Sequence, residues 1–579
     1  MSDTLQTPAA PALPAPAAAA TDWRGLAWAY LFFWYFSGVD HLLLAASGAT
    51  NLSPLRHGLL GSLLWLLPLL AWPRQAKRLA TAIGLLLWVV SLVNLGYFAI
   101  YRQEFSESVL FVLLESNPTE ASEYFESYFA WWMIPALAVY TAGAWWLWRR
   151  LRPLTLSRRT AWLLAFAIVA LLVLPGAVRL HMKNKPVDSA TLPLALAHDL
   201  EPVVPWQFVV GSWKYRQHLQ EMQSMLEQNR RLPPLANLVD THAGQPATLV
   251  LVIGESTSRL HMGLYGYPRP TTPRLEAMRP ELTVFTRVVA ARPYTIEALQ
   301  QALTFADQEH PDRYLDSPSL MNLMRQAGYK SWWISNQQAL SGRNTMLASF
   351  AAQTDEQVYL NHGRSQGSYS YDGKVLEPFE RILADPAERK FIVVHLLGTH
   401  SPYYYRYPSE FARFADRSGL PDWVGDRQLE WINHYDNAVL YNDQVVASLI
   451  DRLRQGGGRS LLLYFSDHGE DVYDSPPHDF RGRNEASPTL PIYAIPFILW
   501  RSPQWQQAWP RRFDGQTGRP FQAASLIHTW ADLAGLSFDG HDPAKSLINP
   551  RFRESPLLAG DPGSPKRLID LRRLQDAWP

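Results

Sequence analysis

Hydrophobic residues in the first third of the chain form long runs that contain almost no charge. Five such runs lie at 25–46, 58–72, 79–101, 128–148 and 160–178. A helix that rises ~1.5 Å per residue needs ~20 apolar residues to cross ~30 Å of hydrocarbon. One run of this kind also fits a buried core helix, but five in succession indicate a membrane domain. We therefore predict a five-helix transmembrane domain over 24–180, preceded by an Ala- and Pro-rich leader at 1–23 that we expect to be disordered.

Charges in the loops between the runs indicate how the helices are oriented. The loops at 73–78 and 149–159 are rich in Arg and Lys, whereas the other loops hold few bases. By the positive-inside rule, the two basic loops face the cytoplasm. Five crossings then place the N-terminus in the cytoplasm and the residues after about 180 outside. In a bacterium this is the periplasmic side of the inner membrane.

The hydrophobic pattern changes after a Pro-rich connector at 181–245, in which we expect one helix. Short apolar segments that fit buried strands lie at 247–253, 330–335, 390–397 and 460–466. Segments with a helical pattern lie at 295–306, 317–327, 372–384 and 436–454. Continuous apolar strands that alternate with helices are typical of a parallel sheet covered on both faces. The sequence thus predicts an α/β domain with a mainly parallel sheet over 246–579.

The composition narrows the class of function. The chain holds 53 Lys and Arg against 52 Asp and Glu, and this near-neutral charge gives no electrostatic reason to expect a nucleic-acid partner. The absence of Cys excludes disulfides, thiolate metal sites and a cysteine nucleophile. The mean hydropathy of −0.14 resembles that of a soluble protein only because it averages a lipid-soluble third with a water-soluble remainder.

Residues of the kind that bind metals follow three of the predicted strands. The first strand runs into Glu255, the third into His400, and the fourth into Asp467 and His468. Because ligands bind at the carboxyl edge of an open α/β sheet, we expect these side chains to lie together. Carboxylate oxygens and imidazole nitrogens without thiolate suit a Zn²⁺ or Mn²⁺ site with an open position. Taken alone, each motif also fits a turn with a structural histidine.

A possible nucleophile lies in the segment RPYTIEAL at 292–299. We interpret Thr295 as the N-cap of the helix that follows, where free N–H groups and the helix dipole favour a phosphate. Bound Zn²⁺ lowers the pKa of a coordinated water from about 15.7 to about 7, and we expect a similar effect on an alcohol. The residues alone do not rank Thr295 above Ser256 or Thr257, which lie beside Glu255.

Together, these motifs resemble the lipopolysaccharide phosphoethanolamine transferases, which are inner-membrane enzymes with five spans and a periplasmic alkaline-phosphatase/sulfatase-like domain. The resemblance covers nearly the whole chain after about residue 24 and rests on VIGES, GYPRPTTP, RPYTIEALQQALTFAD, HLLGTHSPYYYRYP, YDNAVLYND and FSDHGEDVYDSPPH. The segments at 292–301 and 332–338 look most like the branch that modifies a core-region heptose. The lipid A branch usually carries periplasmic disulfides, which this chain cannot form.

The resemblance implies roles for residues at the predicted sheet edge. It implies that Glu255, Thr295, Asp467 and His468 bind a catalytic Zn²⁺, for which Mn²⁺ is a possible substitute, and that Thr295 is also the nucleophile. Two histidines match family residues that bind the phosphoryl group or assist proton transfer, namely His400 and His478.

The resemblance also implies substrate-binding residues outside the metal site. Asn117 and Glu120 match an Asn and a Glu of the membrane half that face the catalytic domain, although a solvated loop is an equal alternative. Asn336 and Arg343 lie where the family carries an acidic and basic pair that binds the donor. Because the residue types differ from that pair, they predict no specific way of recognising ethanolamine.

The implied reaction has two steps. The hydroxyl of Thr295 attacks the phosphorus of phosphatidylethanolamine, and diacylglycerol leaves; an acceptor group of lipopolysaccharide then attacks the covalent intermediate. The expected partners are this donor, this acceptor and membrane lipids. The branch resemblance favours a core heptose as acceptor, with a lipid A phosphate as an alternative. A membrane-anchored hydrolase or glycerophosphate transferase of the same superfamily is a further alternative, and the intact motif set disfavours a non-catalytic protein.

Overall fold

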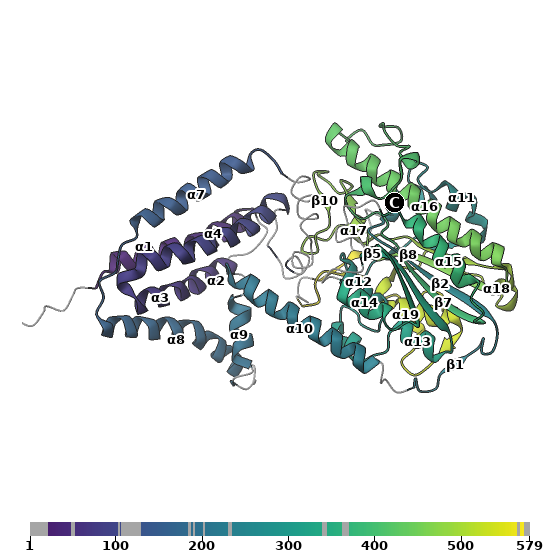
Figure 1. The fold of residues 1–579 in the computed structure, drawn as a ribbon, viewed down its shortest axis with the longest axis horizontal. Coiled ribbons are helices and arrows are strands. Elements are labelled where there is room, and N and C mark those ends of the chain that lie inside the picture. Colours follow the sequence, from purple (N-terminus) through teal and green to yellow (C-terminus); the bar gives the residue numbers. More distant parts are fainter. Residues whose placement is uncertain are drawn as a thin grey trace, which may run out of the picture. The chain divides into compact units, whose positions relative to one another are not determined.

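The chain forms two compact units (Figure 1), and the last boundary along the chain, between 214 and 215, lies inside the predicted connector. One unit comprises 1–110 and 129–214, and the other comprises 111–128 and 215–579. Helix α10 (Trp206–Asn229) contains the later boundary between them. The structure, a computed structural model, describes residues 21–47, 53–101, 105, 110, 129–182, 187–188, 191–200, 203–229, 234–338, 344–361, 370–563 and 568–572.

The first unit is helical. Its helices are α1 (Trp23–Ala46), α2 (Ser53–Gly61), α3 (Leu66–Ala71), α4 (Ala76–Tyr101), α7 (Met133–Arg150), α8 (Arg158–Met182) and α9 (Thr191–Leu200). Among the described residues, three helices are long and apolar enough to cross a membrane, namely Trp23–Ala46, Pro73–Ile100 and Arg158–Met182. They correspond to the first, third and fifth predicted runs. The second run contains a 3₁₀ turn at Ser62–Trp65, and the fourth forms α7, so the count of five spans stays a prediction.

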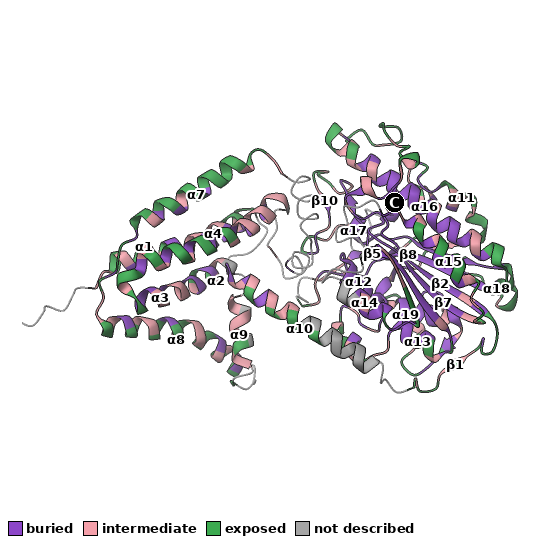
Figure 2. Ribbon diagram, viewed as in Figure 1, coloured by how far each residue is buried: buried purple, intermediate pink, exposed green. Residues whose placement is uncertain are grey.

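The helical unit has a core of its own and an apolar outer surface. Aromatic residues of α1 form much of the core, and Asp40 of α1 is buried and accepts a hydrogen bond from Asn94 of α4 at 3.3 Å. Figure 2 shows α7 and α8 as largely exposed. Their exposed side chains include Val139 and Phe166, which are 74% and 75% exposed. Such an apolar surface on a helix bundle is the surface that lipid covers.

The second unit is built on a seven-stranded sheet in the order β3-β11-β8-β2-β7-β5-β6. Strands β2, β7, β8, β5 and β6 run parallel, while β11 is antiparallel to both of its neighbours. All four predicted strands are present and the sheet is mainly parallel, as predicted. The bounds are β2 (Ala247–Gly254), β3 (Leu282–Val284), β5 (Lys330–Gln338), β6 (Glu356–Asn361), β7 (Arg389–His395), β8 (Ser460–Ser466) and β11 (Phe497–Arg501).

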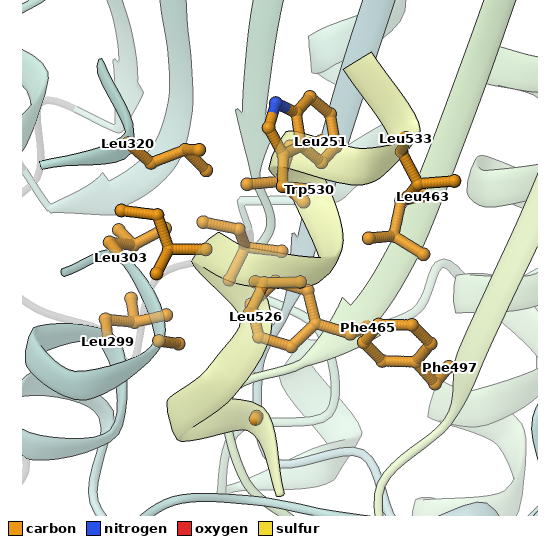
Figure 3. Packing of buried hydrophobic residues seen from close by; sticks show 14 of the residues in the cluster. Leu251, Leu299, Leu303, Leu320, Leu463, Phe465, Phe497, Leu526, Trp530 and Leu533 are labelled. Atoms are coloured by element: carbon orange, nitrogen blue, oxygen red, sulfur yellow. The ribbon is translucent and has the colours of Figure 1, made fainter. Parts of the chain in front are cut away.

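Helices cover both faces of the sheet, which explains why its central strands are apolar throughout. Side chains of β2 alternate between the faces: Leu251 packs with α12 (Thr295–Ala302), α13 (Leu320–Gln326) and α19 (Leu526–Ala534), and Val252 packs with α15 (Leu376–Leu383) and α16 (Asp426–Gly456). Figure 3 shows Trp530 of α19 against Leu251 in the first of these cores. The remaining α-helices and strands of this unit are α11 (Pro273–Ala277), α14 (Asn344–Ala351), α17 (Leu490–Tyr493), α18 (Pro503–Ala508), β1 (Val239–Asp240), β4 (Val288–Val289), β9 (Asp471–Val472), β10 (Arg481–Gly482), β12 (Phe521–Gln522), β13 (Leu536–Ser537), β14 (Leu558–Ala559) and β15 (Ile569–Asp570).

Candidate active site

Three buried side chains converge at the carboxyl ends of two neighbouring strands. Glu255 follows β2, and Asp467 and His468 follow β8, whose last residue pairs with the last residue of β2. His468 Nε2 lies 3.2 Å from Glu255 Oε1 and 3.3 Å from Asp467 Oδ2. The three residues each offer a ligand atom, all within 4.8 Å of one another. The sheet therefore brings together three of the four side chains that the strand ends predict, and His400 is not part of this group.

The hydrogen bonds around these residues leave acceptor atoms directed at one point. His468 Nδ1 lies 2.9 Å from the carbonyl oxygen of Gly469, so Nδ1 carries the proton and Nε2 presents a lone pair. Asp467 Oδ1 accepts from the N–H groups of Ser256 and His468, whereas Asp467 Oδ2 is buried and has no hydrogen-bond partner. Buried acceptors that face one another are unfavourable without a cation or donor between them. Two carboxylates and one imidazole therefore fit a divalent metal such as zinc.

Two glycines allow the strand ends to come this close. A Cβ atom at Gly469 would collide with the backbone oxygen of Pro491, so Gly469 permits the turn that brings Asp467 and His468 to the same site. Gly398 follows β7, has a φ of +55°, and would place a Cβ 2.5 Å from the backbone oxygen of Glu255. Glycine is needed at both positions because the neighbouring atoms belong to the backbone.

Tyr435 of α16 anchors the loop that carries Glu255. Its buried hydroxyl donates to the carbonyl oxygen of Ser256 at 2.7 Å and accepts from the N–H of Ser258 at 2.8 Å. Ser256 itself has a positive φ of 58°, a conformation that is uncommon for a residue with a side chain. The hydroxyl of Tyr435 thus holds a strained loop in the position that aims Glu255 at the other ligands.

Thr295 lies beside this centre, but it is not the N-cap that the sequence predicts. Tyr294 is the N-cap, with extended backbone, and Thr295 is the first residue of α12. The Thr295 hydroxyl donates to Glu255 Oε2 at 3.0 Å and lies 3.4 Å from His468 Nε2. The Ser256 hydroxyl donates to Glu255 at 2.8 Å. Of these two hydroxyls and that of Thr257, the Thr295 hydroxyl contacts two of the three ligand side chains, so the geometry favours it as nucleophile.

Arg483 also borders the three side chains, and the sequence reasoning did not identify it. Its NH1 atom donates to His468 Nε2 at 2.6 Å, and its Nε lies 3.2 Å from Glu470 Oε2. Burial would lower the pKa of Arg483, but the charges of Glu470, Glu255 and Asp467 raise it above the usual value. The guanidinium therefore stays charged and supplies the cation of this site. The sequence signal was two arginines shortly after the predicted His478, on a loop without a periodic pattern.

The two carboxyl groups have opposite pKa shifts. Burial alone would raise the pKa of Glu255, but its hydrogen bond with His468 and the charges of His468, His400 and Arg483 hold this pKa well below the usual range. Burial and the charge of Glu255 raise the pKa of Asp467 to about 7. Two carboxyl groups this close do not both ionise readily without a neighbouring cation. This is the electrostatic setting in which a divalent metal is favoured.

The two predicted proton-transfer histidines have different surroundings. His400 is buried and its charge acts on Glu255, and its Nδ1 donates to the carbonyl oxygen of Ser401 at 2.6 Å. His478 is half-buried and stacks on Trp423, with ring centroids 3.9 Å apart, and its Nδ1 donates to the carbonyl of Tyr473. His400 thus interacts electrostatically with Glu255, whereas the side-chain contacts of His478 include Tyr473 and Trp423.

The predicted donor-binding residue Asn336 lies in a buried hydrogen-bond network. Its side chain is fully buried and bonds to Ser370 and Asp372, and Asp372 in turn accepts from the N–H of Gly398. The next residue, Gln337, donates to Glu255 Oε2 at 3.3 Å and to the carbonyl of Leu396 at 2.9 Å, and so borders the site instead. The remaining predicted substrate-binding residues lie outside the described residues, namely Asn117, Glu120 and Arg343.

Comparisons with known proteins agree with the fold. The Sulfatase family matches residues 247–536. Phosphoethanolamine transferase EptC of Escherichia coli (strain K12) is 50% identical over 553 residues, which are 95% of this chain and 96% of that protein. The chain belongs to the phosphoethanolamine transferase family. The present chain is also 54% identical to the C-terminal periplasmic domain of EcEptC from Escherichia coli, whose crystal structure is a complex with Zn. The two structures match with a TM-score of 0.58, over 60% of this chain and 98% of that chain.

The helical unit of this phosphoethanolamine transferase also has a structural counterpart. The integral membrane protein lipooligosaccharide phosphoethanolamine transferase A (EptA) from Neisseria meningitidis is similar over 90% of this chain and 98% of that chain, with a TM-score of 0.62 and 19% identity. At this identity the likeness concerns the fold alone. It confirms the predicted fold class, a helical membrane region followed by a sulfatase-like α/β domain.

Proposed function

We propose that this enzyme transfers phosphoethanolamine from phosphatidylethanolamine to lipopolysaccharide through a covalent intermediate on Thr295. One observation carries the proposal: the Thr295 hydroxyl donates to Glu255 at 3.0 Å and lies 3.4 Å from His468 Nε2. A hydroxyl that donates to an ionised, buried carboxylate is held in a fixed orientation for attack. The same hydroxyl lies at the first turn of α12, whose free N–H groups favour a phosphate.

The proposal includes a zinc ion bound by Glu255, Asp467, His468 and Thr295. The orphan oxygen of Asp467, the lone pair of His468 Nε2 and the zinc complex of the 54%-identical domain support it. When bound, zinc polarises a phosphoryl oxygen and lowers the pKa of a coordinated hydroxyl. Mn²⁺ suits the same oxygen and nitrogen ligands.

The residues of the chain have separate tasks in this scheme. Glu255 accepts the hydrogen bond of the Thr295 hydroxyl and orients it for attack, while the proton of that hydroxyl passes to water. The N–H groups of α12 together with Arg483 bind phosphoryl oxygens, to which a guanidinium makes strong charge-assisted bonds. His400 protonates the departing diacylglycerol oxygen and later removes the proton of the acceptor hydroxyl. His478 is the second histidine that we propose for this proton transfer, on the strength of the family resemblance alone.

The membrane unit keeps the donor within reach of the site. The acyl chains of the donor stay in the bilayer, so a catalytic domain tethered to five spans acts on a lipid that need not leave it. We propose a multi-pass protein of the bacterial inner membrane with a cytoplasmic N-terminus and a periplasmic catalytic domain. Asn117 and Glu120 are also proposed to bind substrate, on the strength of the family resemblance alone.

The proposed acceptor is a core heptose, because the segments at 292–301 and 332–338 resemble that branch of the family. The test compares lipopolysaccharide from cells without the protein, with it, with Thr295→Ala, and with the exposed control Thr286→Ala. Mass spectrometry of the separated core and lipid A should show phosphoethanolamine on the core for the parent and the control only. Addition to a lipid A phosphate would refute the heptose assignment. Phosphoethanolamine released only into water would identify a hydrolase.

A further inference from the structure

The helical unit contains a cavity of about 440 Å³ between α2, α8 and α9. Figure 1 shows α9 at the end of α8 and close to α2, and these three helices are in contact. Most of the cavity wall is apolar, and it includes Leu64, Leu172 and Leu196. Charged and polar groups also line it, namely Arg56, His57, Arg179 and Asp199. The cavity therefore combines a hydrocarbon-like wall with a cluster of charges.

The charges in the cavity do not cancel. Arg179 donates to both carboxylate oxygens of Asp199 at 2.7 Å, and His57 Nε2 lies 3.9 Å from the same carboxylate. Arg56 is exposed and adds a second guanidinium. Among the described residues that line the cavity, two guanidinium groups and one carboxylate leave a net charge of +1 when His57 is neutral. A net positive charge beside apolar surface favours an anionic ligand.

The size and shape of the cavity indicate what kind of anion it holds. A water molecule occupies ~30 Å³ in the liquid, and a methylene group has a comparable size. The cavity volume of about 440 Å³ therefore corresponds to about fifteen methylene groups. One acyl chain thus fills the apolar part, and a second chain does not fit. A phosphate binds guanidinium groups with strong hydrogen bonds. A membrane phospholipid supplies both parts, whereas free phosphate leaves the apolar wall uncovered.

We propose that this cavity binds an anionic glycerophospholipid, with one acyl chain between α2 and α8 and the headgroup phosphate at Arg56 and Arg179. An anionic headgroup is favoured over a zwitterionic one because an ammonium group would lie beside a net positive charge. In the proposed topology both arginines lie on the outer side, where bases are uncommon by the positive-inside rule. The site is separate from the transfer reaction, whose donor is zwitterionic, and its test does not depend on activity.

The experiment measures lipid retained by the full-length protein in native mass spectrometry after exchange into detergent with dioleoyl phosphatidylglycerol or dioleoyl phosphatidylethanolamine. The parent should retain phosphatidylglycerol preferentially, and inorganic phosphate should not displace it. Arg56→Gln should lower retention of phosphatidylglycerol about fivefold, the effect of one base at a membrane surface, and should leave phosphatidylethanolamine unchanged. Arg74→Gln, which removes a base outside the cavity, serves as the matched control.

A second variant tests the acyl-chain part of the proposal. Leu172→Trp narrows the apolar part of the cavity and should reduce retention of phosphatidylglycerol without changing the headgroup charges. Equal retention of the two lipids by the parent, or displacement by inorganic phosphate, would overturn the proposal. So would equal losses in Arg56→Gln and Arg74→Gln. This last comparison uses surface arginines only and holds whether or not the tryptophan variant folds.

Discussion

Gly398→Ala is predicted to displace Glu255 without changing that residue itself. Gly398 follows β7 with a φ of +55°, and an added Cβ would lie 2.5 Å from the oxygen and 2.7 Å from the nitrogen of the Glu255 backbone. Real Cβ atoms essentially never come within 3.0 Å of a neighbouring atom. Because both contacts are backbone atoms, Glu255 must retreat by roughly half an ångström or more.

The size of that displacement sets the expected effect. Distances in a metal site are held to about ±0.2 Å, so a shift of this size exceeds the tolerance of the site. Disturbing the support of a ligand typically weakens metal binding about 10–100-fold, and we expect a loss in this range for zinc. The left-handed conformation itself costs an alanine about 1–2 kcal/mol of stability, and this cost is separate from the effect on the metal.

The assay pairs Gly398→Ala with Gly244→Ala. Gly244 has a φ of +67° and open space around its Cβ, so it carries the same conformational cost without the collision. Zinc affinity is measured by competition with a chelator and stability by thermal unfolding of the full-length protein. Both variants should unfold at a lower temperature, and Gly398→Ala alone should bind zinc more weakly. Equal zinc affinities in the two variants would refute the view that close approach of Gly398 positions Glu255.

Three further variants probe other parts of the structure. Arg483→Gln should bind zinc more tightly, because no guanidinium then competes for His468 Nε2. Its kcat should fall by about 10²-fold, because a cation that binds the phosphoryl group is lost. Unchanged zinc affinity and kcat would exclude a role for Arg483 in binding the phosphoryl group. Tyr435→Phe should cost about 1–3 kcal/mol in denaturant unfolding, because buried polar groups of the 256–258 loop lose their partner; an unchanged free energy of unfolding would show that the loop needs no anchor. Burial lowers the pKa of His528 to about 3, so below about pH 6.5 the unfolded chain binds a proton that the folded chain does not. Relative to His528→Asn, the parent should therefore lose roughly 1.4 kcal/mol of unfolding free energy per pH unit below that value. Parallel profiles of unfolding free energy against pH would contradict this expectation.

The metal site was predictable because it depends on topology. Parallel strands end at one edge of a sheet, and Glu255, Asp467 and His468 directly follow two strands that the apolar pattern identifies. Arg483 was not predictable in this way, since it lies on an irregular loop after β10 that only tertiary folding brings to His468. The sequence predicts Thr295 as the N-cap of α12, whereas the structure has it one residue later, as the first residue of the helix. The presence of a hydroxyl side chain does not by itself distinguish these two positions.

The limits of the fold prediction also have physical causes. Strands β2, β5, β7 and β8 are buried on both faces and therefore read as apolar runs. The unpredicted β3 and β6 lie at the two edges of the sheet, are mostly not buried, and carry no such pattern. β11 lies in an apolar stretch that Pro491 and Pro496 interrupt, so the sequence did not mark where a strand begins.

The covalent intermediate is tested most directly by mapping it. The purified full-length protein is incubated with phosphatidylethanolamine in the absence of lipopolysaccharide, quenched, digested, and analysed by tandem mass spectrometry. We predict one phosphoethanolamine group on the hydroxyl of Thr295, absent in Thr295→Ala and lost when acceptor is added. The same adduct on Ser256, or an adduct of equal yield in Thr295→Ala, would contradict the account.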